Sequence, residues 1–261
     1  MDLNLHGRHA LVCGGSAGIG HALAVELAAM GARVTLLARH AEGLDAALAA
    51  LPTPMGQQHA RHALDLADGA ALQALIDGPL AGQDVDILVN NSGGPAGGRV
   101  IDASLDAFER AFAPHLLASH RLVQALVPGM RARRFGRIIN IVSTSVYEPI
   151  PGLGVSNTLR AAVAGWAKTL SRELAGDGIT VNNVLPGYTR TRRIREIVDA
   201  RVAKEGRSAE QVEADLLAHV PAGRMAEAHE VAAAAAFLAS PAAGYITGVS
   251  LAVDGGRMQS I

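Results

Sequence analysis

The sequence predicts a doubly wound α/β fold, in which a parallel sheet carries helices on both faces. Short apolar runs, typical of strands buried on both sides, alternate with longer alanine-rich patterns of helical periodicity. The runs occupy residues 10–13, 33–38, 85–90, 138–142, 180–185 and 250–253, and the helical patterns fall near 18–30, 42–51, 68–77, 104–134, 156–175 and 227–239. Right-handed crossovers between parallel strands then place helices on both faces of the sheet.

The chain shows no sign of division into separate domains. Its 261 residues suffice for one α/β domain, and no linker rich in proline, glycine or serine interrupts it. We therefore expect a single domain over residues 1–261. Residues 191–220 differ from the rest of the chain. They are charged and helical in pattern, and they follow closely on Pro186-Gly187. This stretch is predicted to be a mobile lid over a ligand.

The charge balance argues against nucleic acid or an anionic membrane as the main partner. The chain has 23 basic and 24 acidic side chains, which gives a formal net charge of -1. One basic cluster, Arg131 to Arg137, is interpreted as a solvated helix end. The longest apolar run, residues 231–239, is too short to span a bilayer.

The number of cysteines indicates the cellular compartment, and the spacing of the histidines shows whether a metal site is expected. Cys13 is the only cysteine, so no intrachain disulfide can form, and a reducing, cytoplasmic location is expected. The ten histidines are scattered and lack the helical spacing or acidic companions of a ligand set. No metal site is therefore predicted.

The most informative motif is the glycine-rich loop between the first strand and the first helix. Its glycines follow the spacing G-x-x-x-G-x-G, from Gly14 through Gly18 to Gly20, with Ser16 and Ile19 between them. Such a loop allows close backbone approach to a pyrophosphate and aims helix N-terminal amides at negative charge. A plain tight turn is the alternative. The strand-loop-helix context favours a dinucleotide site of the Rossmann type.

Residues after the next strands fit the same ligand. Arg39 ends the second strand, where an acidic residue would favour NAD, and its guanidinium can bind a 2′-phosphate. We therefore expect NADP(H) as the preferred cofactor, with NAD(H) as a second option. The alternative for Arg39 itself is a solvated side chain at the end of the strand, without a role in binding. Asp65 and Leu66 are candidates for contact with the adenine. Asn91 and Gly93 follow the strand predicted at residues 85–90, where they can approach the cofactor ribose or pin the sheet.

Taken together, these motifs resemble the short-chain dehydrogenase/reductase family from end to end, most closely its 3-oxoacyl-carrier-protein reductase branch. The matching segments are 14–20, 90–93, 136–143, 181–187, 244–248 and 253–256. The resemblance implies a seven-stranded sheet and hydride transfer between NAD(P)(H) and a carbonyl or alcohol. It also implies a homotetramer, or a homodimer, and places Pro186 and Gly187 at the cofactor.

The positions that carry catalysis in that family depart from its pattern. The family uses a serine, a tyrosine and a lysine, with an asparagine one helix earlier. Ser143 matches the serine, whereas Ser156, Arg160 and His115 stand at the positions of the tyrosine, the lysine and the asparagine. The chain is similar in its Ser-x-x-x-Arg spacing to a subgroup with an imperfect tetrad.

These substitutions change the available acid. Serine is a weaker acid than tyrosine, so proton transfer could lose up to ~4 kcal/mol, or about a thousandfold in rate. Arg160 lies one helical turn from Ser156 and can act as the cation towards it or towards the nicotinamide ribose. Tyr147, Tyr188 and His115, which can titrate near neutral pH, are other candidate acids. Packed loop aromatics and a hydrogen-bonded buried imidazole are the alternatives for these three.

Three functions remain open. The first is an NADP-preferring oxidoreductase acting on a small carbonyl, such as a 3-oxoacyl compound, or on an alcohol. The second is a cofactor-holding subunit or sensor that has lost its chemistry. The third is an elimination, as in the halohydrin dehalogenases, which also carry arginine at the lysine position but keep the tyrosine and lack the glycine loop.

Overall fold

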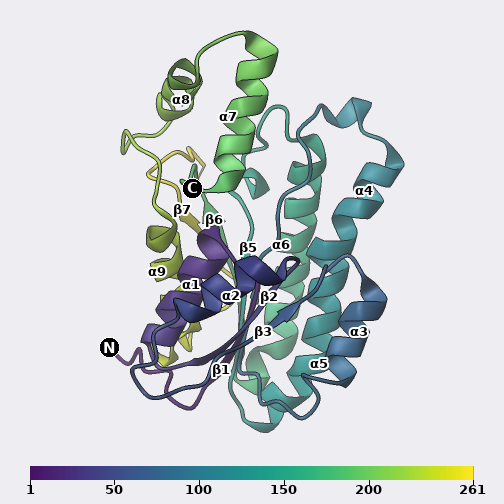
Figure 1. The fold of residues 1–261 in the computed structure, drawn as a ribbon, viewed down its shortest axis with the longest axis vertical. Helices are drawn as coiled ribbons and strands as arrows, with labels where there is room; N and C mark the ends of the chain where they lie inside the picture. Colours follow the sequence, from purple (N-terminus) through teal and green to yellow (C-terminus); the bar gives the residue numbers. More distant parts are fainter. Residues whose placement is uncertain (261) are drawn as a thin grey trace.

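The computed structural model describes residues 1–260 and contains one seven-stranded parallel sheet (Figure 1). The strands are β1 (His9–Cys13), β2 (Arg33–Ala38), β3 (Ala60–Ala63), β4 (Ile87–Asn90), β5 (Gly136–Ile141), β6 (Ile179–Pro186) and β7 (Ser250–Val253). Their order across the sheet is β3-β2-β1-β4-β5-β6-β7, and every neighbouring pair is parallel. The predicted α/β architecture is confirmed.

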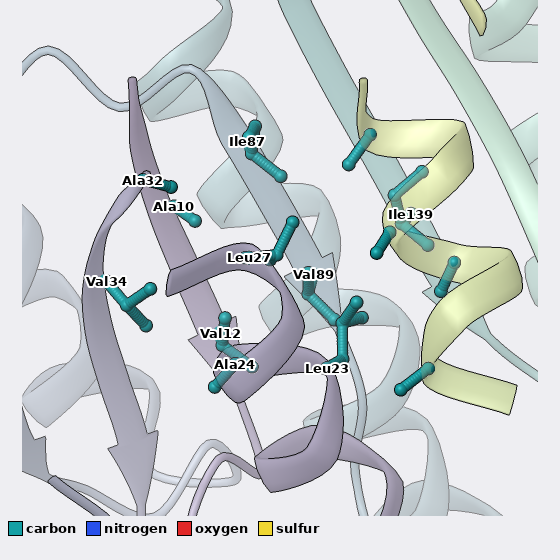
Figure 2. Close-up of a cluster of buried hydrophobic side chains, with 14 of the residues drawn as sticks. Ala10, Val12, Leu23, Ala24, Leu27, Ala32, Val34, Ile87, Val89 and Ile139 are labelled. Carbon is teal, nitrogen blue, oxygen red and sulfur yellow. The ribbon is translucent and has the colours of Figure 1, made fainter. Parts of the chain in front are cut away.

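Helices cover both faces of this sheet. They are α1 (Gly18–Ala29), α2 (Ala41–Ala49), α3 (Gly69–Asp77), α4 (Leu105–Phe112), α5 (Ala118–Ala132), α6 (Gly154–Leu174), α7 (Arg192–Glu205), α8 (Ala209–Leu217) and α9 (Ala228–Ala239). One core cluster joins the sheet to α1, α2 and α9, and a second joins it to α3, α5 and α6. Figure 2 shows Leu23, Ala24 and Leu27 of α1 packed over β1 and its neighbours in the first cluster. No helix within residues 1–260 combines the length and apolar character needed to cross a membrane.

The strand order creates a switch point between β1 and β4. These two strands are neighbours, but the chain leaves β1 for α1 on one face and leaves β4 for α5 on the other. The loops that follow them therefore diverge and open a crevice at the carboxyl ends of the strands, which is where open α/β sheets bind ligands. The glycine-rich loop after β1 and the segment after Asn90 form its two sides.

A chain of buried amides runs across the sheet close to this crevice. The side-chain amide of Asn90 donates to Asn140 Oδ1 at 2.9 Å, and that of Asn140 donates to Asn183 Oδ1 at 2.9 Å. Asn183 in turn donates to Ser250 Oγ at 3.0 Å. These four residues face one another in register on β4, β5, β6 and β7. Because an unpaired buried amide costs free energy, this amide ladder favours one alignment of the strands.

The helix predicted over residues 104–134 is confirmed as one continuous helical stretch from Leu105 to Ala132. What the sequence did not predict is the π-helical segment at Ala113–Leu117, which joins α4 to α5. Pro114 lies in this segment and has no backbone N–H to donate, and the Ala118 N–H reaches back five residues to the Ala113 carbonyl. The hydrophobic periodicity continues through this change, so the pattern alone concealed it.

The interpretation of Arg131 to Arg137 as a solvated helix end is wrong for Arg137. This side chain is buried, and its guanidinium lies 4.1 Å from the centre of the Phe135 ring. It also donates to the backbone carbonyls of Gly136 at 2.9 Å and Ser240 at 3.3 Å. Arg137 therefore anchors the start of β5 to the region after α9.

Replacing Asn140 with leucine is expected to lower the free energy of unfolding by about 2–5 kcal/mol, because it leaves the Asn90 amide and the Asn183 oxygen buried and unpaired. Urea titration followed by circular dichroism measures the change. The exposed Asn4, replaced in the same way, serves as the control. Equal stability of the Asn140→Leu variant and the parent would show that the ladder does not stabilise the sheet.

Candidate functional site

The turn between β1 and α1 lines the crevice with main-chain atoms of glycine residues, which carry no side chains. Gly14 and Gly18 have φ angles of +61° and +58°, a region that side chains rarely tolerate. A β-carbon on Gly14 would lie 2.5 Å from Asn91 Nδ2, and one on Gly20 would overlap the Gly14 carbonyl oxygen. The helix start at Ala17 has no side-chain cap and no acidic residue in its first turn. Its amides are left for an anion, so the loop fits a dinucleotide pyrophosphate.

The side chain of Asn91 holds this turn in place. Its amide donates to the carbonyls of Cys13 and Gly14, each at 3.3 Å, so the loop after β4 is tied to the end of β1 and the loop that follows it. The buried Cys13 side chain, directly before the turn, packs in the second core cluster, and burial raises the pKa of its thiol to about 12.

The predicted adenosine-binding residues lie around the ends of β2 and β3. Arg39 is exposed directly after β2. Ser16 lies against α2, where a β-carbon on Gly43 would be 3.6 Å from its Cβ. After β3, the Asp65 carboxylate accepts a hydrogen bond from the Ala67 N–H at 2.9 Å, and Leu66 packs against the second core cluster. Arg39 is thus free to reach a ligand, whereas Leu66 serves the core as well.

The segment after β6 reaches the same crevice. Gly187 lies so close to β7 and its continuation that a β-carbon there would be 2.7 Å from Asp254 Cα. Beyond Pro186-Gly187, Thr191 approaches the glycine-rich loop, with its Cγ2 3.4 Å from a β-carbon placed on Gly18. Helices α7 and α8 then extend from one end of the molecule in Figure 1 and share a hydrophobic cluster of their own with Met225 and Tyr188.

Three of the predicted catalytic side chains come from β5 and α6. Ser143 follows β5, and its Oγ accepts a hydrogen bond from the Ser145 N–H at 3.0 Å. Ser156 is buried near the start of α6, which packs against the short turn after Ser143. Arg160, one turn further on, donates through Nη1 to the Ile141 carbonyl at 2.9 Å. Burial, together with the charge of Arg193, lowers the pKa of Arg160 to about 10, so it stays charged at neutral pH.

His115 lies in the π-helical segment and is only 6% exposed. Its Nδ1 lies 2.8 Å from the Ala111 carbonyl, so this nitrogen carries the proton of the neutral ring, and Nε2 has no hydrogen-bond partner within residues 1–260. Burial and then the Arg160 charge lower its pKa to about 4, although the Ala111 and Gly93 carbonyls oppose the shift. The expectation that His115 titrates near neutral pH is therefore wrong, because the site desolvates it beside a cation.

The similarity to known proteins extends over nearly the whole chain. A family model described as enoyl-(acyl carrier protein) reductase matches residues 14–257. The chain is 36% identical over 254 residues to the 3-oxoacyl-[acyl-carrier-protein] reductase FabG of Haemophilus influenzae, covering 97% of this chain and 98% of that protein. The chain belongs to the short-chain dehydrogenase/reductase family. It is an NAD(P)-dependent oxidoreductase of that family, similar to FabG.

Solved structures of short-chain dehydrogenases/reductases share the fold in full. L-sorbose reductase from Gluconobacter frateurii, complexed with NADPH and L-sorbose, superposes with a TM-score of 0.93 at 31% identity over 100% of both chains. YwfH, an NADPH-dependent reductase involved in bacilysin biosynthesis, gives a TM-score of 0.90 at 29% identity and covers 97% of this chain and 99% of that one.

The other candidate acids of this dehydrogenase/reductase lie in different surroundings. Tyr147 is 54% exposed in the loop after β5. Tyr188 packs against the cluster of α7 and α8, and the Arg257 guanidinium lies 5.0 Å from the centre of its ring. Within residues 1–260, no three His, Cys, Asp or Glu side chains are grouped so as to hold a metal ion.

Thr191 and Arg193 lie in the segment predicted as the lid, but the sequence did not single out either side chain. Thr191 contacts the glycine-rich loop, and Arg193 donates through Nη2 to the Pro95 carbonyl at 2.6 Å. One signal was available for Arg193: arginines crowd the first turn of α7, where the helix dipole disfavours positive charge.

The wild-type protein is expected to lose stability on acidification partly through His115. Its pKa lies near 4 in the folded protein, against 6.5 for the free group, so the unfolded chain binds the proton first as the pH falls. The stabilising contribution is complete above pH 6.5 and is lost as the pH falls through 4. Between pH 7 and 4.5, urea titrations should show the wild-type free energy of unfolding falling about 2–3 kcal/mol more than that of His115→Gln. Parallel pH profiles for the two proteins would contradict this.

Proposed function

We propose that this protein transfers hydride between NADP(H) and a small carbonyl or alcohol compound through an altered tetrad. Ser143, Ser156, Arg160 and His115 occupy its four positions. The observation that carries the proposal is the uncapped, glycine-lined start of α1 at the same sheet edge as Ser143 and the charged Arg160. The similarity to FabG supports an oxo group in a 3-oxoacyl-like compound as the reacting centre.

The cofactor is assigned as NADP(H) from the residues that would hold it. Backbone amides of residues 14–20 hold the pyrophosphate, with Ser16, Gly18 and Ile19 in the loop, and Arg39 binds the 2′-phosphate. Asp65 and Leu66 border the adenine, and Asn91 and Gly93 border the ribose near Pro186 and Gly187. YwfH and L-sorbose reductase are both NADPH proteins, which supports the same choice. When bound, the nicotinamide supplies or accepts the hydride.

Three side chains then stabilise the negative charge that develops on the substrate oxygen. Because Ser143 Oγ already accepts from the Ser145 N–H, its own hydrogen is left to donate to the substrate. Arg160 uses Nη1 on the Ile141 carbonyl, and its remaining N–H groups serve Ser156 and the cofactor ribose. Ser156 donates the proton in place of a tyrosine, at a cost of up to ~4 kcal/mol in that step. We therefore expect slow turnover.

A cofactor-holding subunit or sensor is the second candidate. The glycine-rich loop fits a nucleotide fully, whereas three of the four positions that carry catalysis in the family hold different residues. Such a protein would bind NADPH tightly and oxidise it with no carbonyl compound. In that case variants at Ser143 and Arg160 would leave its biological role unchanged.

Residues 191–220 are proposed as the lid over this site, and the edge of the sheet as a contact between copies of the chain. The lid helices have their own small core, and Thr191 lies close to Gly18, where a β-carbon would be 3.4 Å from its Cγ2. At the sheet edge, Leu251 is 38% exposed and the nearby Tyr245 is fully exposed. These exposed apolar side chains support a homodimer or homotetramer in which a second copy covers this edge, and light scattering would distinguish either from a monomer.

The cofactor assignment is tested by replacing Arg39 with glutamine. NADPH should bind at least tenfold more weakly, because a guanidinium-phosphate contact is lost, while NADH binding stays within about twofold. Nucleotide fluorescence titration measures both. Arg110→Gln, which changes an exposed arginine on α4, provides the control. An equal effect of Arg39→Gln on both nucleotides would contradict the assignment.

Catalysis is tested by NADPH oxidation across a panel of 3-oxoacyl thioesters, ketones and aldehydes. Ser143→Ala and Arg160→Met should each lower kcat by about 10²–10³-fold, since each removes a group that stabilises the developing oxyanion. Thr169→Ala, which changes an exposed hydroxyl on α6, should leave kcat unchanged. Tight NADPH binding with no oxidation by any member of the panel would favour the sensor over the enzyme.

A further inference from the structure

The first turn of α7 concentrates positive charge where it is electrostatically unfavourable. Arg192, Arg193 and Arg195 follow Arg190, and the turn contains no acidic residue to oppose the positive end of the helix dipole. Arg190 and Arg192 are compensated at the surface, by Glu227 at 3.2 Å and Glu196 at 3.2 Å.

Arg193 differs from its neighbours because it turns inward across the crevice. Its Nη2 donates to the Pro95 carbonyl at 2.6 Å, and its Nε would lie 3.4 Å from a β-carbon on Gly94. The only carboxylate paired with it within residues 1–260 is the exposed Glu196, at 3.7 Å, which it shares with Arg192. Arg193 therefore bridges the lid and the loop after β4 with much of its charge uncompensated.

A second arginine and a buried imidazole lie on the inner side of this bridge. Arg160 forms no ion pair within residues 1–260, and the charge of Arg193 adds to burial in lowering its pKa. His115, which the Arg160 charge also reaches, is 6% exposed and has an unpartnered Nε2. Two cations and a neutral polar ring thus lie near one another and near the loop of residues 93–95.

On the basis of the proposed function, we propose that the substrate carries a carboxylate close to its reacting carbonyl or hydroxyl group and that Arg193 binds this carboxylate. The two arginines repel each other, and an anion between them relieves the repulsion. A guanidinium matches a carboxylate through paired hydrogen bonds, so the recognition is directional. Arg193 is then the residue that determines specificity, and the lid closes on the anionic substrate.

The same charge could instead serve a phosphate of the cofactor. The amides at the start of α1 already face the pyrophosphate, and Thr191 marks that end of α7 by its contact with Gly18. Arg193 lies two residues further along and turns to Gly94 and Pro95, which favours the substrate as the source of the anion. The experiment separates the two sources.

The test uses the full chain as its NADPH complex, in which hydroxy acids bind without reacting. Each 2- and 3-hydroxy acid from four to eight carbons is compared with its primary amide through the change in NADPH fluorescence. NADPH affinity is measured separately. The variants are Arg193→Gln, Arg193→Lys and, as the matched control on the same helical turn, Arg192→Gln.

At least one acid should bind the wild type tenfold to a hundredfold more tightly than its amide. Arg193→Gln should reduce this preference to threefold or less, Arg193→Lys should keep part of it, and Arg192→Gln should keep all of it. NADPH affinity should stay within about threefold throughout. Acids and amides that bind equally, or not at all, would overturn the inference, as would an acid preference that survives Arg193→Gln.

A large loss of NADPH affinity in Arg193→Gln with no acid preference in the wild type would instead assign the anion to the cofactor and overturn the proposal. The proposed function fails in a different way, when tightly bound NADPH is oxidised by no carbonyl compound. Selective binding of acids would stand even then, so the two failures can be told apart.

Discussion

The site depends on the close contact between the loops that follow β1 and β4. A single amide, that of Asn91, donates to two carbonyls of the first loop, and the space it occupies is available only because residues 14 and 20 have no side chain. Together with the hydrogen bond from the Gly15 N–H to the Leu37 carbonyl at 3.1 Å, this contact fixes the direction of the amides at the start of α1. The glycine-rich loop, Ser143 after β5 and the segment that begins at Thr191 all lie near this one junction.

Features that depend on residues close together in the sequence were predicted from short sequence patterns. The glycine spacing, the apolar strands and the positions of Ser143 and Arg160 are visible in short stretches of sequence, and the structure places them at one sheet edge. The fold class followed from alternation alone, since continuous apolar runs require cover on both faces.

What escaped prediction depends on segments that meet only in three dimensions. The π-helical segment at Pro114 preserves hydrophobic periodicity, so nothing in the pattern marked it. The sequence predicted a solvated position for Arg137. In the structure, Phe135 and the region after α9 enclose its side chain. The pKa of His115 depends on burial and on a cation from another helix, neither of which a sequence displays.

The sole thiol of the chain offers a way to observe this junction at work. Cys13 is buried at the end of β1, directly before the cradle, and is almost entirely protonated while the sheet is closed. A thiol reagent can modify it only when the packing of the second core cluster around it opens. The rate at which Cys13 is alkylated therefore measures how often the packing at the end of β1 opens. The same rate, measured with the nucleotide bound, shows how far the nucleotide suppresses that opening.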